Sequence, residues 1–255
     1  MVLCGLIQVI LFGNHSMILA MTCISTLGSI VWVHHMYSVG LEMDTRAYFT
    51  TVTMMISLPT GSKIFNWLCT YLGTYIWLLQ YQQCSIYYVV IFLCMFTIGG
   101  SSGVILGNGC VDLVLHDTYY VVTHFHYVLS LGSIISIFSG LICYQDQILP
   151  SQMLHLSLPS VTSNLLTYHL IVVFVGIVLS FTPMHFLGFN VLPRRIPDYT
   201  DYLNVWHYMC SIGSGLTLIS FFVLWELGTN RTHISIQIVP SRVPLLSRYL
   251  YSYGQ

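Results

Sequence analysis

Two histidines, His124 and His126, lie one residue apart in the otherwise apolar run Val-Val-Thr-His-Phe-His-Tyr-Val-Leu (121–129). The apolar residues around them extend too far for a single strand, and a helix satisfies its own backbone hydrogen bonds in apolar surroundings. Positions two apart on a helix differ by about 200°, so the two imidazoles should face opposite sides. They are therefore poor ligands for one metal ion and good ligands for two different ones.

With its side chains a helix is about 10–12 Å across, so two irons held on its opposite sides would lie at about that separation. Such a separation suits electron hopping between two haems. The alternative is that each histidine only bonds a backbone carbonyl or a neighbouring helix. Ionisable groups deep in an apolar segment are costly and usually functional, which favours the metal-binding interpretation.

His34 and His35 are adjacent at the end of another apolar segment. On a helix they would point about 100° apart. They could converge on one metal if they used different ring nitrogens, or if the helix ended there. Imidazole nitrogens without thiolate make copper plausible. The alternative is a pair that faces water at a membrane surface.

Lys63 is the only lysine in the chain and lies in Leu-Pro-Thr-Gly-Ser-Lys-Ile-Phe (58–65). Placing a lysine in the middle of a membrane span costs about 2.5–3.5 kcal/mol on insertion scales. One interpretation is a proton relay with the Thr60 hydroxyl, where Pro59 and Gly61 loosen the helix. The other is that Lys63 snorkels to the inner surface.

His116 and Asp117 come just before a further apolar segment. Asp117 could cap that helix with no other role, or the pair could bind a hard divalent ion at a subunit junction. The other histidines show no pairing that we can interpret, and we assign them to packing or interfaces: His15, His155, His169, His185, His207 and His233.

The composition identifies an integral membrane protein. Of the 255 residues, 56% are hydrophobic and only 6% are charged, whereas soluble domains carry about 25% charged residues. There is no basic tract for nucleic acid, and the eight cysteines are scattered without a CxxC pair, so we expect them to pack as small apolar residues.

The apolar runs predict an all-α fold, a bundle of about six transmembrane helices in one domain that spans 1–255. The expected spans are 16–33, 45–71, 83–106, 117–143, 164–186 and 203–228, with a polar tail over 229–255. If the positive-inside tendency places that tail on the inner side, then 34–44, 107–116 and 187–202 all lie at the outer face. Arg194 and Arg195 are then exceptions to the tendency, so an anion on that face should hold them.

Four stretches closely resemble subunit I of the cytochrome c oxidases, in the haem–copper oxidase family. They are 32–50 with Trp-Val-His-His-Met-Tyr, 59–67 with Pro-Thr-Gly-Ser-Lys, 112–130 with His-Asp-Thr-Tyr-Tyr-Val-Val-Thr-His-Phe-His, and 192–199 with Leu-Pro-Arg-Arg. Their order and spacing agree with the family over nearly the whole chain. The motif His-Asp-Thr-Tyr-Tyr (116–120) favours the cytochrome c branch over the quinol oxidases.

The resemblance implies a role for each matched residue. His34 and His35 would be two of the three ligands of the copper CuB, His124 the axial ligand of haem a3, and His126 an axial ligand of haem a. His116 and Asp117 would bind magnesium shared with subunit II. Arg194 and Arg195 would pair with haem propionates, Asp112 would belong to the haem-binding set, and Thr60 and Lys63 would belong to a proton pathway.

The resemblance also implies which parts are absent. The sequence opens at what resembles the last turns of the family's sixth helix, so the third CuB ligand and the second haem a ligand are not in it. We therefore expect a separate chain carrying the N-terminal part of subunit I to dock against 1–12 and the 16–33 span, with 1–15 the remnant of a shared helix. Further expected partners are subunits II (with CuA) and III, cytochrome c, O2 and membrane lipid.

The expected function is reduction of O2 to water, coupled to proton pumping in the mitochondrial inner membrane as part of respiratory complex IV. The alternatives are a quinol-oxidising haem–copper oxidase and a proton-coupled transporter whose histidines hold no metal. Haem bands and bound copper in the complex would distinguish the oxidases from the transporter.

Overall fold

The computed structural model describes residues 11–73, 83–144 and 159–236, and within these ranges the regular elements are helices. In chain order they are α2 (Asn14–Gly28), the 3-10 helix η1 (Trp32–Val39), α3 (Met43–Met55), α4 (Ser57–Leu72), α5 (Gln83–Gly107), α6 (Gly109–Leu115), α7 (Tyr119–His126), the π-helix η3 (Tyr127–Ile134), α8 (Ile135–Cys143), α11 (Pro159–Phe189), the 3-10 helix η4 (Asp201–Leu203) and α12 (Asn204–Ile236). Residues 1–10 of the expected docking segment 1–12, and most of the expected tail, lie outside the described residues.

Five of the six predicted spans correspond to segments long and apolar enough to cross a membrane. These segments are 14–39, 85–107, 119–143, 165–189 and 201–225. The sixth predicted span, 45–71, is formed by α3 and α4 in succession. The prediction of an all-α membrane bundle with about six spans is thus confirmed.

The break between α3 and α4 has its cause in Pro59. Proline has no N–H, so it cannot bond the carbonyl four residues earlier, which belongs to Met55, the last residue of α3. Ile56 separates the two helices, and the Thr60 hydroxyl donates to the Ile56 carbonyl at 2.9 Å. The loosened helix predicted around Pro59 is therefore observed one turn before that residue.

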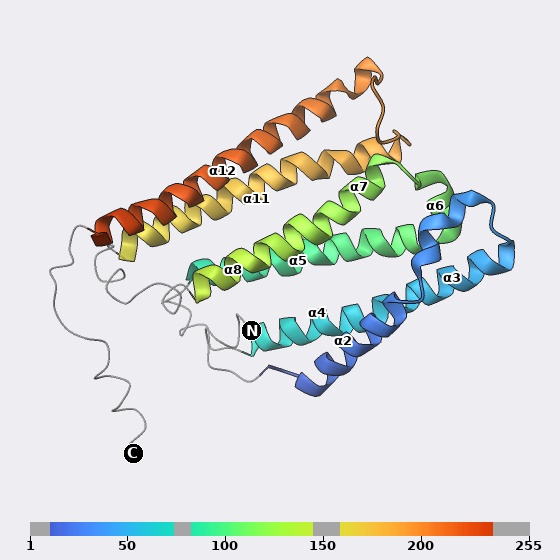
Figure 1. Ribbon diagram of the computed structural model, residues 1–255, viewed down its shortest axis with the longest axis horizontal. Helices are drawn as coiled ribbons and strands as arrows, with labels where there is room; N and C mark the ends of the chain where they lie inside the picture. The colour runs from blue at the N-terminus through green and yellow to red at the C-terminus, as the bar shows by residue number, and fades with distance from the viewer. Residues whose placement is uncertain (1–10, 74–82, 145–158, 237–255) are drawn as a thin grey trace.

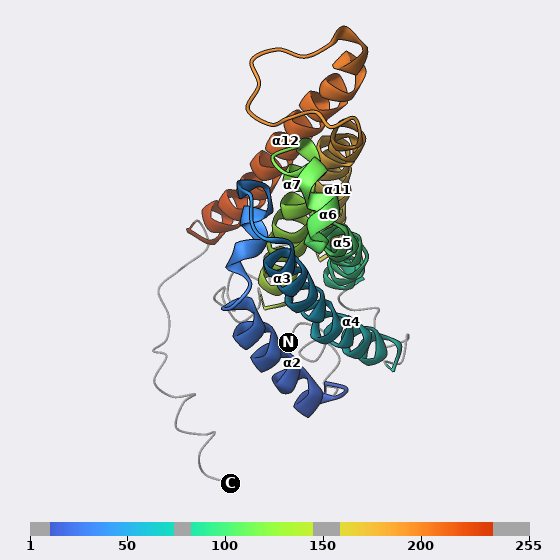
Figure 2. The same cartoon turned by 90° about the vertical axis from the view of Figure 1, so that its right-hand side faces the viewer.

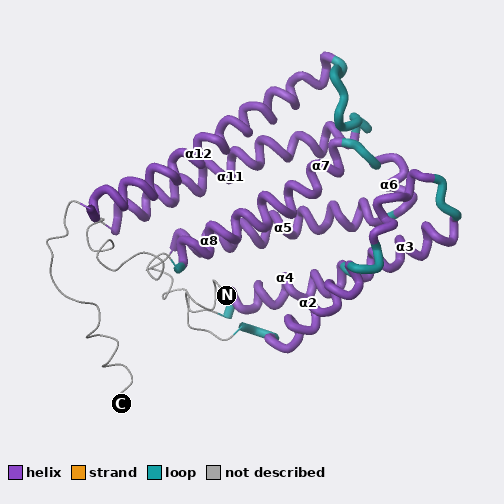
Figure 3. The backbone as a smooth tube through the Cα atoms, viewed as in Figure 1, coloured by secondary structure: helices purple, strands orange, loops and turns teal. Residues whose placement is uncertain are grey.

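Neighbouring helices run side by side in three groups (Figures 1 and 3). Helix α11 lies along α12, α5 lies along the continuous rod of α7, η3 and α8, and α2 lies along α4. In the view turned by 90°, the α5 group lies between the other two (Figure 2). A core of nine buried residues is formed where this central group meets α11.

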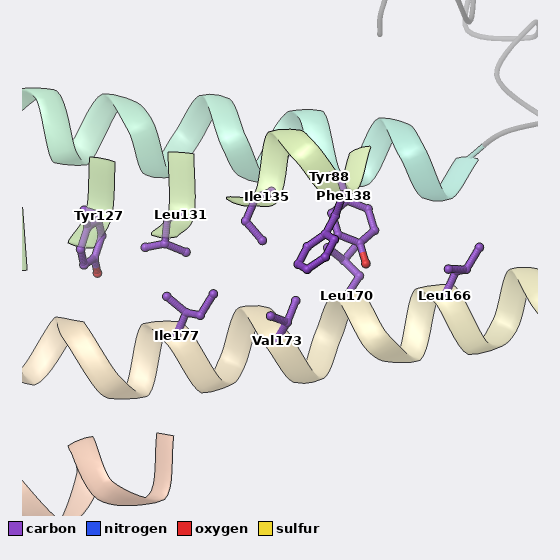
Figure 4. Close-up of a cluster of buried hydrophobic side chains, with 9 residues drawn as sticks. All are labelled: Tyr88, Tyr127, Leu131, Ile135, Phe138, Leu166, Leu170, Val173 and Ile177. Carbon is purple, nitrogen blue, oxygen red and sulfur yellow. The ribbon is translucent and has the colours of Figure 1, made fainter. Parts of the chain in front are cut away.

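In that core, side chains of η3 and α8 face those of α11 (Figure 4). Leu131 and Ile135 are fully buried, as is Val173 on the opposite helix. Between α11 and α12 the backbones approach closely at glycines, because a Cβ on Gly213 would lie 2.6 Å from the Gly176 carbonyl oxygen. Small residues at such crossings are typical of helix packing in membranes.

The three segments predicted to share a membrane face lie at the same end of the bundle, with η1, α6 and the 190–201 loop together (Figure 1). The Arg194 N–H donates to the Asp117 carbonyl at 2.8 Å, and Thr118 forms an isolated bridge with Pro193. The Gly109 N–H donates to the Thr50 hydroxyl at 3.1 Å, which ties α6 to α3. Their predicted grouping is confirmed.

Candidate functional site: two opposed histidines and a histidine pair

His124 lies against α5. Its Nδ1 is 2.9 Å from the Gly99 carbonyl oxygen and 3.0 Å from the Ser102 hydroxyl. The ring fits there because position 103 is glycine, where a Cβ would lie 2.6 Å from the ring atom Cε1. The imidazole is thus held by polar contacts in a recess of the neighbouring helix.

His126 lies against α11. Its ring stacks on Phe181, with 4.3 Å between centroids and 14° between planes. Its Nδ1 is 2.8 Å from the Val122 carbonyl oxygen of its own helix. The predicted placement of the two histidines on opposite sides of one helix is therefore confirmed by their contacts with two different neighbouring helices.

Both histidines keep one ring nitrogen for a ligand. A carbonyl oxygen can only accept, so each Nδ1 must carry the proton it donates, and each Nε2 then presents a lone pair. A histidine that ligates a metal typically donates its other N–H to a carbonyl or carboxylate. The backbone bonding weighed as an alternative is observed, but it occupies only one nitrogen of each ring and leaves the other with a lone pair.

His34 and His35 converge. Their Nε2 atoms are 3.0 Å apart and their ring centroids 4.1 Å apart. Two nitrogens that each bind one metal at about 2.0–2.1 Å lie roughly 3 Å apart when the nitrogen–metal–nitrogen angle is between a right angle and the tetrahedral angle. The pair uses the same ring nitrogen on both residues, although adjacent side chains of a 3-10 helix such as η1 leave its axis about 120° apart. The donor set therefore fits two ligands of a copper ion.

Helix α5 relates the histidine pair to His124. The His34 Nδ1 is 3.4 Å from the Thr53 hydroxyl, and the Thr53 methyl would meet a Cβ on Gly107 at 3.2 Å. Gly107 is one helical turn, about 6 Å, from Gly103, which contacts His124. The pair is thus linked through Thr53 to the turn of α5 that follows the one in contact with His124.

His116 lies between two carboxylates. Its Nδ1 is 3.8 Å from Asp112 and its Nε2 is 4.0 Å from Asp117. Burial raises the pKa of the Asp112 carboxyl above its ordinary value, although His116 and His35 act in the opposite direction. Within the described ranges no group of three or more His, Cys, Asp or Glu side chains is arranged to hold a metal. A magnesium ion at His116 and Asp117 would need ligands beyond these.

The alternative in which Asp117 caps the following helix is wrong. Thr118 is the N-cap of α7, and its hydroxyl accepts from the Tyr120 N–H at 3.3 Å. Asp117 has a positive φ of 58° and forms an ion pair with Arg194. The left-handed turn at Asp117 directs its carboxylate to the 190–201 loop instead of the helix end.

Arg194 and Arg195 differ in their surroundings. An anion was expected to hold Arg194 at that end of the bundle, and Asp117 is that anion. The Arg194 Nε is buried without a hydrogen-bond partner in the described part of the chain. Such an orphan donor fits a further acceptor, for example a propionate. Arg195 is exposed and has a positive φ of 64°.

Lys63 is half-buried on α4, with its Nζ 5.3 Å from the centroid of the Trp67 ring. It therefore turns toward the C-terminal end of α4, away from the end that carries the histidine segments (Figure 1). The Thr60 hydroxyl donates to its own helix. The proton relay and the snorkelling lysine both accommodate this orientation, so the role of Lys63 stays a prediction.

The residues that hold His124 were missed by the sequence reasoning. The signal for them is the run Gly-Gly-Ser-Ser-Gly (99–103) inside an apolar span, because consecutive small residues permit close approach of another group. Phe181 gave no comparable signal, since one phenylalanine in an apolar helix is unremarkable in sequence.

The uninterpreted histidines with described side chains are mostly packed against aromatic rings. The His169 Nδ1 is 2.6 Å from the Tyr88 hydroxyl and the side chain is fully buried, while His185 contacts Tyr127 and His207 stacks on Tyr199. The expectation of packing is confirmed for these three. Six cysteines in the described part of the chain carry free thiols, as expected: Cys23, Cys69, Cys94, Cys110, Cys143 and Cys210.

Comparison with known proteins decides the family. Residues 1–216 match the family described as "Cytochrome C and Quinol oxidase polypeptide I". The chain belongs to this family. It is 53% identical over 213 residues to cytochrome c oxidase subunit 1 of Plasmodium falciparum, covering 84% of this chain and 43% of that protein. It is 45% identical over 221 residues to the Theileria annulata protein of the same name, covering 82% and 41%.

The chain thus spans less than half the length of these relatives. Its fold is similar to that of a solved haem–copper terminal oxidase dimer, with a TM-score of 0.67, 19% identity and coverage of 91% of this chain and 44% of that one. This similarity confirms that the bundle has the haem–copper oxidase fold.

Proposed function

We propose that this chain supplies the C-terminal part of the catalytic subunit of a cytochrome c oxidase, which reduces O2 to water with electrons from cytochrome c and couples the reaction to proton pumping. The observation that carries the proposal is the arrangement around α5 and α7. His124 and His126 leave opposite sides of one helix, and Thr53 links His34 to the next turn of the helix that contacts His124.

Each histidine has a distinct task in this proposal. The Nε2 of His124 would hold haem a3, that of His126 would hold haem a, and His34 and His35 would hold CuB. These groups, when bound, supply the redox chemistry and O2 binding that amino-acid side chains lack. The protein orients the two imidazole rings through hydrogen bonds from the Nδ1 of His124 to the Gly99 carbonyl and from the Nδ1 of His126 to the Val122 carbonyl.

The remaining site residues would manage charge. Arg194, already paired with Asp117, would use its free Nε toward a propionate, and Arg195 and Asp112 would belong to the same haem-binding set. His116 and Asp117 would hold magnesium together with ligands from subunit II. Lys63 and Thr60 would pass protons from the inner side, and a proton taken across the membrane potential is worth about 2.3 kcal/mol per 100 mV.

The second ligand of haem a and the third ligand of CuB would come from the portion of the relatives' length that is outside this sequence. We propose that subunits II and III complete a complex in the mitochondrial inner membrane.

A visible spectrum of the purified complex, combined with metal analysis, tests the proposed function. Bands of haem a with bound copper and iron are expected. A colourless complex would instead support the metal-free transporter. The family description also includes quinol oxidases, and a companion subunit without a dinuclear copper centre would favour that branch.

A further inference from the structure

The ring of His126 has few constraints from its own helix. It is the last residue of α7, and at Tyr127 the backbone changes to the wider π-helix η3. The hydrogen bond from Nδ1 to the Val122 carbonyl holds one edge of the ring. The second side-chain torsion of histidine has a broad minimum, so one bond at one edge leaves the plane of the ring free to tilt.

Phe181 supplies the missing constraint from another helix. Its ring is nearly parallel to that of His126, with centroids 4.3 Å apart and 14° between planes. Phe125 is also 4.3 Å away, but it is inclined by 32° and is the chain neighbour of His126, so it moves with the same backbone. Of these two ring contacts in the described part of the chain, the one with Phe181 ties the plane to the position of α11.

The next residue on each helix strengthens this tie. The hydroxyls of Tyr127 and Thr182 are 2.6 Å apart, so the consecutive residues 126–127 contact the consecutive residues 181–182. Pro183 follows directly, and its ring fixes the local φ of α11. Phe181 is therefore carried by a segment that is itself held in register with the start of η3.

His124 is held by different means. Its ring contacts the Gly99 carbonyl, the Ser102 hydroxyl and the recess at Gly103, and no aromatic ring in the described part of the chain is recorded as stacking on it. A change at Phe181 should consequently affect one histidine and leave the other as it is.

We propose that Phe181 is a positioning residue that sets the plane of the His126 imidazole, and with it the electronic structure of the low-spin haem that His126 would bind. The inference rests on the proposed function. In a low-spin ferric haem the orientation of the axial imidazole planes sets the anisotropy of the EPR signal. A rotated or mobile ring shifts and broadens that signal, whereas loss of general packing does not do so selectively.

The experiment compares four variants in the assembled oxidase complex. Phe181→Leu and Phe181→Met remove the flat face while keeping apolar volume, and Phe181→Tyr retains the face. Phe186→Leu is the matched control, because Phe186 lies on the same helix and stacks on Trp206 at 4.9 Å and 23°. EPR spectra of the oxidised complex report the low-spin haem, and CO binding to the reduced complex reports the high-spin haem.

We expect a shifted and broadened low-spin signal in Phe181→Leu and Phe181→Met, a wild-type signal in Phe181→Tyr and Phe186→Leu, and unchanged CO binding in all four. A wild-type signal in both Phe181→Leu and Phe181→Met would overturn the inference while leaving the proposed function intact. An equal shift in Phe186→Leu would also overturn it. The same holds if Phe181→Leu and Phe181→Met both fail to assemble while Phe186→Leu assembles. Absence of any low-spin haem in the wild-type complex would instead remove the proposed function.

Discussion

His124 and His126 are two residues apart on one helix, yet His124 contacts the Gly99 carbonyl of α5 and His126 stacks on Phe181 of α11. The helix between them separates two environments, one polar and one aromatic. Two groups bound at these residues would occupy different gaps of the bundle and could be perturbed independently.

Replacing each histidine by alanine should therefore remove a different chromophore. His124→Ala should abolish CO binding to the reduced complex, whereas His126→Ala should abolish the low-spin haem bands, because each variant would lose the axial ligand proposed for that haem. Reduced visible spectra with and without CO provide the measurement. His169→Leu is the control: His169 is fully buried beside Tyr88, and both signals should persist. The same loss in both alanine variants would contradict separate sites.

Gly103→Ala should disturb the site of His124 alone. The new methyl group would lie 2.6 Å from the His124 Cε1, so the ring must move against its bond to Gly99. We expect weaker CO binding with unchanged low-spin bands. Gly100→Ala is the matched control on the same helix, since nothing lies within 4 Å of a Cβ there. It should bind CO normally and stabilise α5 by about 0.5–1 kcal/mol. Equal behaviour of the two variants would show that His124 can shift without consequence.

Lys63→Met should slow reduction of the high-spin haem by about tenfold or more, which corresponds to about 1.4 kcal/mol in activation free energy. The reason is that the chain has no other lysine to carry protons along α4. Stopped-flow reduction under anaerobic conditions measures this phase. The reaction of the fully reduced enzyme with O2 and the neighbouring variant Ser62→Ala should stay close to wild type. Unchanged reduction in Lys63→Met would support a lysine that only snorkels.

Asp117→Asn should loosen the 190–201 loop. The ion pair with Arg194 links this loop to the start of α7, and both side chains are partly exposed, at 31% for Arg194 and 54% for Asp117. Exposed pairs contribute about 0.2–1 kcal/mol, so hydrogen exchange of the loop amides should increase by up to about fivefold. Arg194→Gln should have a similar effect that is not additive with Asp117→Asn, and the exposed Arg195→Gln should have little. Additive effects would mean that the pair does not hold the loop.

Local periodicity was sufficient for the opposed histidines. The angle between positions two apart is a property of any α-helix, so His124 and His126 had to diverge once their segment was helical. The grouping of the His34, His116 and Arg194 segments at one end followed equally well, because spans of membrane length alternate in direction.

Contacts between helices were not accessible in this way. The convergence of the His34 and His35 Nε2 atoms depends on the side-chain torsions of the two residues, and the pairing of Asp117 with Arg194 depends on a left-handed turn. An N-cap role for Asp117 is a sound expectation from residue type. Thr118 is the N-cap instead, because Asp117 forms an ion pair with Arg194, which lies 77 positions later in the chain.

The sequence by itself determined that this protein is a membrane bundle of the oxidase family and which histidines diverge, because composition, helical period and motif spacing are local properties. Only the tertiary structure decided which nitrogen each imidazole presents, that α5 provides the glycine recess for His124 and that Phe181 faces His126. Those outcomes depend on how separate helices are placed against one another. Packing between residues distant in the chain produces no periodic pattern in the sequence from which it could be predicted.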